Sequence, residues 1–265
     1  MTETATLASP ELHFAGVYRR RVHASLARIW ENVFDWEHLP ALHAHSFDQV
    51  RLVSYAGDEQ VVEIDNAGGH RTVIHTVGDR GGHRYRVHTT EGKGTGSEVR
   101  VQLTPREPHL TDIEVQYHVP EHRPERLERI GAAFVPFYAR LWDEDEAMMR
   151  DRERRLNARR GRPVAEPVNL GPVEAVEAAL PLTAEVGGEP FRVLRDGGEL
   201  IAHAAVCPHW LGPLDATPVE AGVVRCPWHG WRFDVRTGAE VDGRPCRLPA
   251  PPKVSVEAGE VWLRP

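Results

Sequence analysis

The hydrophobic positions in the first 120 residues predict a strand, two short helices and a run of antiparallel strands. Residues 17–23 have the composition of a strand, and Ser25 can cap a helix that follows. The apolar side chains of that helix repeat with helical period: Leu26, Ile29, Trp30, Val33 and Phe34. After a short second helix, glycine-rich turns separate six β-like runs, near 47–55, 59–66, 70–77, 83–90, 97–104 and 111–119. These six runs predict an antiparallel meander.

A long helix is expected after the meander. From Arg123 to about Arg159 the chain has no glycine after Gly131, and its apolar side chains keep helical spacing. Pro136 should kink this helix. The order of elements predicts a helix-grip domain, in which an antiparallel sheet cups its final helix. Because such a sheet encloses a cavity, we expect a small-molecule site inside it.

The composition changes near the end of the long helix. The stretch ARRGRPVAEP is rich in arginine, proline and glycine, which predicts a linker between two domains. We place the first domain at 13–158, the linker at 159–169 and the second domain at 170–265. The fold class predicted is therefore α+β, a helix-grip domain followed by a small all-β domain.

Composition and charge exclude several kinds of partner. The chain has 265 residues, of which 41% are hydrophobic and 27% charged, and its formal net charge is −7. A negative chain is a poor nucleic-acid ligand, because binding phosphates needs a basic face. No apolar run approaches the roughly 20 residues of a membrane span, and the first residues do not resemble a signal peptide. We therefore expect a cytoplasmic protein with no nucleic-acid or membrane partner.

The cysteines and histidines of the second domain predict a metal centre. The chain has three cysteines, and two of them lie in short motifs that each add a histidine, Cys207-Pro-His209 and Cys226-Pro-Trp-His229. Two thiolates and two imidazoles suit a [2Fe-2S] cluster in which each residue type holds one iron. A structural zinc is the alternative, although zinc motifs usually pair residues of one type. Cys246 lies outside both motifs and is expected to be a small packed residue.

The longer strings CPHWLGPLD and CPWHGWRFD resemble the two cluster-binding loops of Rieske proteins, over about 170–265. Both loops lack the extra cysteine that forms a disulfide in respiratory-complex Rieske proteins, so the chain is similar to the oxygenase and ferredoxin branches. The resemblance implies that Cys207, His209, Cys226 and His229 hold the cluster. Leu211 stands where the family commonly has glycine.

A second candidate metal site lies in the first domain. The stretch FDWEHLPALH contains Asp35, His38 and His43. His-x4-His pairs occur three times in the chain, but only this one has an aspartate three residues before it. An oxygen-activating Fe(II) site needs two imidazoles and one carboxylate on one side of the metal. The spacing of five residues puts the two histidines about 140° apart on a regular helix, so Pro40 or a bulge must turn the second one inward.

The long helix offers the third ligand. Within WDEDEAMM, Asp145 follows the apolar stripe toward the core, whereas Asp143, Glu144 and Glu146 are expected to be solvated. A lone carboxylate on an apolar face is costly unless it is paired or bound to a metal. Asp145 could instead form a salt bridge with an arginine beneath the helix, and His38 could be a surface histidine. His45 is an alternative to His43 as the second imidazole.

The set Asp-x2-His-x4-His with Leu-Trp-Asp-Glu-Asp145 resembles the mononuclear-iron motif of Rieske non-haem iron oxygenases, and the element order over 13–158 resembles the START-like, Bet v 1-related superfamily. The resemblance implies that His38, His43 and Asp145 hold Fe(II). It also implies that Asp35 bridges to a cluster histidine on a neighbouring subunit of a ring-shaped homo-oligomer, such as a trimer. The domain order is the reverse of the family's, in which the Rieske domain comes first.

Two functions follow from these motifs. The first is an oxygenase that takes electrons from a ferredoxin and/or an NAD(P)H-dependent reductase and uses O2 to oxidise a small organic substrate. The second is a START-like binding module fused to a Rieske ferredoxin-type electron carrier, without mononuclear iron. The set of Asp35, His38, His43 and Asp145 favours the oxygenase.

Overall fold

The chain folds into two compact units, residues 1–150 and 151–265. The computed structural model describes residues 11–66, 68–158 and 163–265, so part of the expected linker, residues 159–162, lies outside the described residues. Residues 163–167 have no regular secondary structure. No helix among the described residues has the length and apolar character needed to cross a membrane.

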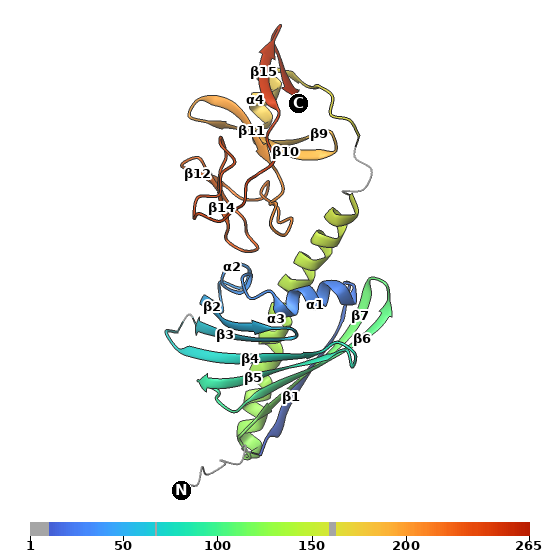
Figure 1. Ribbon diagram of the computed structural model, residues 1–265, viewed down its shortest axis with the longest axis vertical. Coiled ribbons are helices and arrows are strands. Elements are labelled where there is room, and N and C mark those ends of the chain that lie inside the picture. The colour runs from blue at the N-terminus through green and yellow to red at the C-terminus, as the bar shows by residue number, and fades with distance from the viewer. Residues whose placement is uncertain (1–10, 67, 159–162) are drawn as a thin grey trace. The chain divides into compact units, whose positions relative to one another are not determined.

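The first unit is built on one antiparallel sheet with the strand order β1-β7-β6-β5-β4-β3-β2 (Figure 1). Strands β2 to β7 each pair with the next in sequence, and β1 pairs with β7. The elements in chain order are β1 (His13–Val22), α1 (Leu26–Phe34), α2 (Leu39–Leu42), β2 (Phe47–Ala56), β3 (Glu59–Asn66), β4 (Arg71–Asp79), β5 (Arg84–Gly92), β6 (Glu98–Glu107), β7 (Leu110–Val119) and α3 (Pro124–Ala158). This is the predicted helix-grip order.

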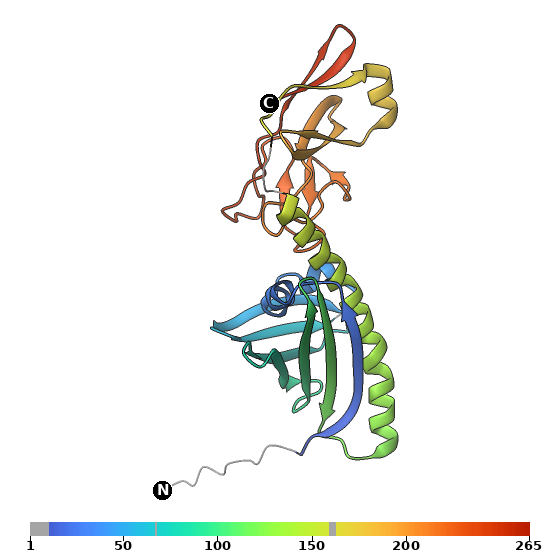
Figure 2. The same cartoon turned by 90° about the vertical axis from the view of Figure 1, so that its right-hand side faces the viewer.

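Helix α3 packs along one side of the curved sheet (Figure 2). Phe134, Trp142 and Met149 of the helix join a buried cluster that includes Val99 and Val115 of the sheet. The helix continues through Pro136. Gly131 lies where α3 meets β1, and a Cβ there would collide with the carbonyl oxygen of Ala15. A glycine inside this helix therefore permits the close approach of helix and strand.

Helix α1 begins where its sequence predicts. The Ser25 side chain accepts a hydrogen bond from the backbone N–H of Arg28, which satisfies one of the free donors at the start of the helix. Ile29 and Trp30 are buried in the same cluster as the sheet residues. Helix α1 thereby fixes the position of the chain just before Asp35 and His38.

The second unit consists of three small antiparallel sheets, each with three strands: β11-β10-β9, β12-β13-β14 and β15-β16-β8. Its elements are β8 (Val168–Pro172), α4 (Val173–Ala179), β9 (Leu182–Val186), β10 (Glu189–Asp196), β11 (Glu199–Ala204), β12 (Val219–Glu220), β13 (Val223–Arg225), β14 (Arg232–Asp234), β15 (Lys253–Glu257) and β16 (Glu260–Arg264). The short helix α4 was not predicted. The predicted fold class, a helix-grip sheet domain followed by a small β domain, is confirmed.

Candidate metal centres

Two tight turns of the same design carry the cysteines and histidines of the second unit. One begins at Cys207, after β11, and the other at Cys226, between β13 and β14. In the first turn the Leu211 N–H donates a hydrogen bond to the Cys207 carbonyl (2.9 Å), and in the second the Gly230 N–H donates to the Cys226 carbonyl (2.9 Å). Leu211 and Gly230 have almost equal positive φ angles, 68° and 70°. Leucine in place of glycine therefore leaves the shape of the first turn unchanged.

The four candidate ligands of these turns come together inside the unit. Cys207 and Cys226 are buried, and their thiols lie within hydrogen-bonding reach of each other. The imidazole centroids of His209 and His229 are 4.6 Å apart, with an angle of 76° between the ring planes. The indole of Trp231 stacks on His209 with a centroid distance of 3.9 Å. One turn thus supplies a thiol and an imidazole, and the other turn supplies the second pair.

The paired thiols favour a negative charge at this centre. A hydrogen bond from Cys207 lowers the pKa of Cys226 to about 5; burial opposes this shift, and His229 adds to it. The pKa of Cys207 is raised, first by the hydrogen bond with Cys226 and then by burial. The proximity of the two thiols therefore favours a thiolate at Cys226, and thiolate is the form that binds metals.

The packing around the Cys226 thiol is tight. A Cβ at Gly212 would lie 2.6 Å from the Cys226 sulfur and 3.2 Å from the Trp228 indole, so a larger residue does not fit. Two thiolates and two imidazoles are the donor set of a Rieske [2Fe-2S] cluster, with zinc as the chemical alternative. The residues present therefore fit the cluster that the sequence predicts.

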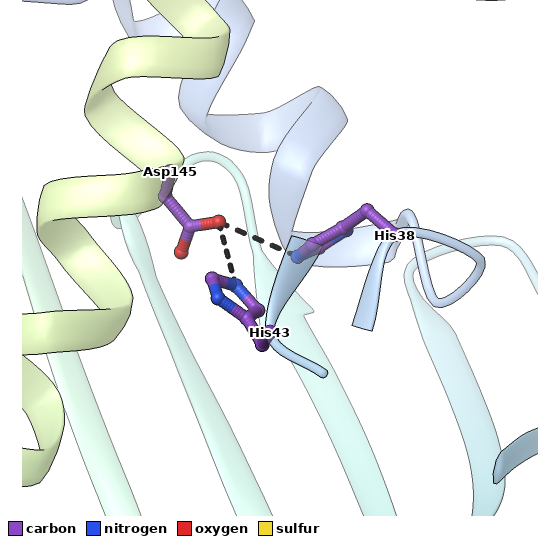
Figure 3. Close-up of side chains that lie close together, drawn as sticks. All are labelled: His38, His43 and Asp145. Atoms are coloured by element: carbon purple, nitrogen blue, oxygen red, sulfur yellow. Dashed lines mark hydrogen bonds and ion pairs between the residues drawn. The ribbon is translucent and has the colours of Figure 1, made fainter. Parts of the chain in front are cut away.

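The candidate mononuclear centre is built on α2, which is a single turn. His38 is its N-cap residue and His43 its C-cap residue, so both histidines flank the regular part of the helix. The angular mismatch of a five-residue spacing thus disappears. Figure 3 shows both imidazoles pointing toward Asp145 of α3, and their ring centroids are 5.1 Å apart.

The three side chains form a compact and buried group. The Asp145 Oδ1 lies 3.0 Å from Nε2 of His43 and 3.4 Å from Nε2 of His38 (Figure 3). The candidate ligand atoms all lie within 4.8 Å of one another. Exposed fractions are 3% for His38, 1% for His43 and 7% for Asp145. Two imidazoles and one carboxylate at this spacing fit a divalent iron site.

Charge is strongly coupled inside this group. Burial lowers the pKa of His38, but hydrogen bonds to Asp145 and Asp35 outweigh burial and raise it to about 10. Burial likewise raises the pKa of Asp145, whereas hydrogen bonds from His38 and His43 lower it to about 2. The metal-free group is therefore an ion-paired network, and a bound metal would take the place of the shared proton.

Carboxylates also lie beside the outer nitrogens of both histidines, and the Glu144 carboxylate is hydrogen-bonded to His43. Glu144 lies 2.6 Å from Nδ1 of His43, and Asp35 lies 3.4 Å from Nδ1 of His38. Metal-bound histidines commonly use a carboxylate in this way, because it fixes the ring orientation. His45 is not part of the three-residue group, and its Nδ1 lies 3.6 Å from Glu144. Of the two alternatives, the structure places His43 beside Asp145.

The expectation that Glu144 and Glu146 are solvated is wrong. Glu144 contacts His43, and Glu146 is buried, 2.6 Å from Arg20 and 2.8 Å from Nδ1 of His23. The apolar pattern of the helix underestimates the burial of these two side chains, because His43 at the end of α2 contacts Glu144, and Arg20 and His23 near the end of β1 contact Glu146. Arg20, the arginine beneath the helix, pairs with Glu146 and Asp143. Asp143 is exposed, as predicted.

A cavity of about 1010 Å³ lies in the first unit beside this centre. Its wall includes Leu39, which follows His38, and Leu141, one helical turn before Asp145. Phe47 also lines the cavity, and its ring centroid is 6.2 Å from that of His43. The volume is at the upper end of the range for small-molecule pockets. The candidate metal centre thus adjoins one end of a cavity large enough for an organic ligand.

Sequence reasoning missed Glu144 as a partner of His43. Its only signal was its position next to Asp145, and nothing in a helical pattern distinguishes it from other acidic residues of α3. It also missed the positively charged residues of the cavity wall, Lys93, Arg126 and Arg129. These residues have no motif, since they come from a turn and from the first part of a helix.

Sequence comparisons with known proteins match the second unit. A family model described as the Rieske [2Fe-2S] domain matches residues 166–254. The Ferredoxin CarAc of Metapseudomonas resinovorans is 34% identical over 79 residues, which cover 29% of this chain and 73% of that protein. The anthranilate 1,2-dioxygenase ferredoxin subunit of Burkholderia cepacia is 37% identical over 70 residues, which cover 26% of this chain and 65% of that protein.

Among solved structures, the Zhui aromatase/cyclase of Streptomyces sp. R1128 is similar over 54% of this chain and 96% of its own chain. The sequence identity is 12% and the TM-score is 0.43.

Proposed function

The chain belongs to the Rieske [2Fe-2S] family through residues 166–254, and we propose that it is a Rieske-type non-haem iron oxygenase. The similarity of this chain to ferredoxin components supports an electron-transfer role for the Rieske domain. In the proposal, electrons come from a ferredoxin and/or an NAD(P)H-dependent reductase. They are used at the first unit to oxidise a small organic substrate with O2.

One observation carries the proposal: the buried group of His38, His43 and Asp145 at the end of a large cavity. Burying three ionisable side chains is costly unless they are paired or bind a metal. A plain binding module would have no need for this arrangement. Two imidazoles and one carboxylate leave open positions on iron, as oxygen-activating sites require.

The residues of the first unit have distinct roles in this proposal. His38, His43 and Asp145 would hold Fe(II), which supplies the oxygen chemistry when bound. Glu144 holds the His43 ring in the orientation that directs Nε2 toward Asp145. The apolar cavity wall orients the substrate beside the metal centre and keeps water away from it.

The residues of the second unit would hold the cluster, with Cys207 and Cys226 on one iron and His209 and His229 on the other. The cluster supplies electrons when bound. The stacked indole of Trp231 restricts the rotation of the His209 ring. A restricted His209 ring would move little when the charge of the cluster changes.

A second function has support from the comparisons. The ferredoxin relatives are electron carriers by name, and the chain is 34% and 37% identical to them over the aligned residues. A START-like binding module fused to such a carrier would need the cluster but no mononuclear iron. The two functions therefore differ in the number of metal sites.

Counting iron and acid-labile sulfide in the anaerobically reconstituted full-length protein separates the two functions. If the oxygenase proposal holds, we expect about three irons and two sulfides per chain, two irons from one [2Fe-2S] cluster and one from the mononuclear site. Two irons with two sulfides, unchanged after loading with ferrous iron, would support the electron carrier and reject the oxygenase.

Asp35 is proposed to connect the two centres. Its buried carboxylate already contacts Nδ1 of His38, and in the proposal it also accepts an N–H bond from a cluster histidine on a neighbouring subunit of a homo-oligomer, such as a trimer. Asp35→Asn should keep both metals but slow reoxidation of the cluster by O2 and substrate at least about 100-fold, because the amide lacks the charge that orients both rings. Rapid mixing measures the rate. An unchanged rate, or loss of the mononuclear iron, would reject the bridge.

A further inference from the structure

The cavity of the first unit is chemically uneven. Its deep wall is apolar and aromatic, with Val87 and Val99 from the sheet facing Phe134 and Tyr138 from α3. The Tyr117 and Phe134 rings stack with a centroid distance of 4.7 Å. This part of the wall offers no charge and would bind an apolar body.

Three cations lie on the wall at the other end. Arg126 and Arg129 come from the first turns of α3, and Lys93 comes from the turn between β5 and β6. Glu121 is the one carboxylate among the lining residues, and it is held by Arg123 at 2.8 Å and by Arg126 at 3.3 Å. The lining therefore carries two net positive charges, in a chain whose formal net charge is −7.

Two of these cations have no anionic partner. In the part of the chain that the structure describes, neither Lys93 nor Arg129 forms an ion pair, whereas many other exposed arginines of this unit do. Nearby on the wall, the Ser97 hydroxyl is 3.2 Å from that of Thr89. Hydroxyl groups and unpaired cations at one end suit an anionic group on the ligand.

The cationic end is far from the candidate metal centre. Asp145 follows Arg129 by 16 residues on the same helix, which corresponds to about 24 Å along its axis. Leu39 and Leu141 mark the metal end of the wall, and the apolar residues lie between. A ligand that binds Arg129 through its charge, and that is long enough to span the cavity, would therefore place its apolar part at the metal end.

We infer that the cavity binds an elongated, apolar molecule with one anionic group, which lies against Lys93 and Arg129. The binding site itself does not depend on iron. Oxidation of the apolar end of this molecule at the metal centre rests on the proposed function.

A pair of fluorescent probes can test the site on the full-length protein without iron. Anilinonaphthalene sulfonate carries one anionic group, and N-phenylnaphthylamine has the same aromatic body without it. We expect the double variant Lys93→Gln/Arg129→Gln to bind the sulfonate about tenfold more weakly, because two exposed charge-assisted contacts are lost. Binding of the neutral probe should change less than about twofold, because its apolar contacts remain.

Two further variants complete the test. Arg100→Gln removes one positive charge from an arginine that does not line the cavity and should change neither probe. Ala133→Trp places an indole on the cavity wall and should weaken both probes. The inference is rejected if the double variant binds the sulfonate like the parent, if it loses both probes equally, or if Ala133→Trp leaves both bound. Iron counts on separately reconstituted samples of the same variants report on the oxygenase, so failure of one proposal does not conceal failure of the other.

Discussion

The two candidate metal centres differ in how the chain assembles them. In the second unit, each turn brings a cysteine and a histidine that are two or three residues apart, and backbone hydrogen bonds within the turn set their positions. In the first unit, His43 and Asp145 are separated by 102 residues and meet only because α3 packs against the sheet and α2. The first arrangement is encoded locally. The second depends on the tertiary structure of its whole unit.

The electrostatics of the two centres differ as well. The cluster turns concentrate sulfur, and one thiol has a lowered pKa. The candidate mononuclear centre surrounds two imidazoles with carboxylates, so that ion pairs form without any metal. Loss of metal should therefore leave unlike states: a pair of close thiols in one unit, and a hydrogen-bonded network in the other.

The largest expected effect is loss of the cluster alone. Cys226→Ala removes one of two thiolate ligands, so we expect no acid-labile sulfide and no cluster absorbance. Mononuclear iron should remain at about one per chain, because its ligands belong to the other unit. The matched control is Cys246→Ala, which removes a cysteine outside both turns and should keep the cluster. Loss of all iron in Cys226→Ala would show that the two centres are not independent.

The reciprocal change is Asp145→Ala. It removes the only carboxylate of the three candidate ligands, so iron should fall from about three to about two per chain while sulfide stays at about two. Asp143→Ala is the control on the same helix, since Asp143 is exposed and pairs with Arg20. Iron and sulfide analysis after ferrous loading gives the result. Full iron occupancy in Asp145→Ala would remove Asp145 from the site.

The difference between the two centres also explains what the sequence could predict. The spacing of the cysteines and histidines predicts a metal centre in the second unit, and the glycine-rich turns predict the antiparallel meander. Asp145 could be predicted because the helical stripe continues to it. The apolar stripe failed for Glu146, since that side chain is buried against Arg20 of β1 and His23 just after it, which helical periodicity does not contain. The positive φ of Leu211 could not be predicted, because it cannot be inferred from the amino-acid sequence of the turn.

A smaller effect is expected from Glu144→Gln. The amide keeps the size of the side chain but loses the charge that holds Nδ1 of His43 at 2.6 Å. Outer partners of this type typically contribute 10–100-fold to metal affinity, so we expect Fe(II) or Co(II) to bind about 10–100-fold more weakly. Glu128→Gln, an exposed change on the same helix, should have no effect in the same anaerobic titration. Equal affinities would mean that Glu144 contributes nothing to the metal site.

The smallest expected effect is a change in the stability of the Rieske unit when the two turns are altered. Leu211 adopts a φ of 68°, which costs a non-glycine residue about 1–2 kcal/mol, but its side chain is only 2% exposed. Removing a buried leucine costs about 2–5 kcal/mol, so the loss of burial outweighs the relief of strain. Leu211→Gly should therefore lower the free energy of unfolding by about 2 kcal/mol, and the Tm of this unit by roughly 10 °C.

Gly230→Ala is the matched change in the other turn. Here the added methyl group introduces backbone strain and gains no buried contacts to offset it. It should cost about 1 kcal/mol, because its φ is 70° and its Cβ would come within 3.1 Å of the flexible end of Arg225. Anaerobic thermal unfolding, followed by cluster absorbance, measures both variants. A Leu211→Gly protein more stable than its parent would mean that backbone strain exceeds the packing of that leucine. The two turns would then share their shape for different reasons: in one a buried side chain outweighs the strain, and in the other the absence of a side chain avoids it.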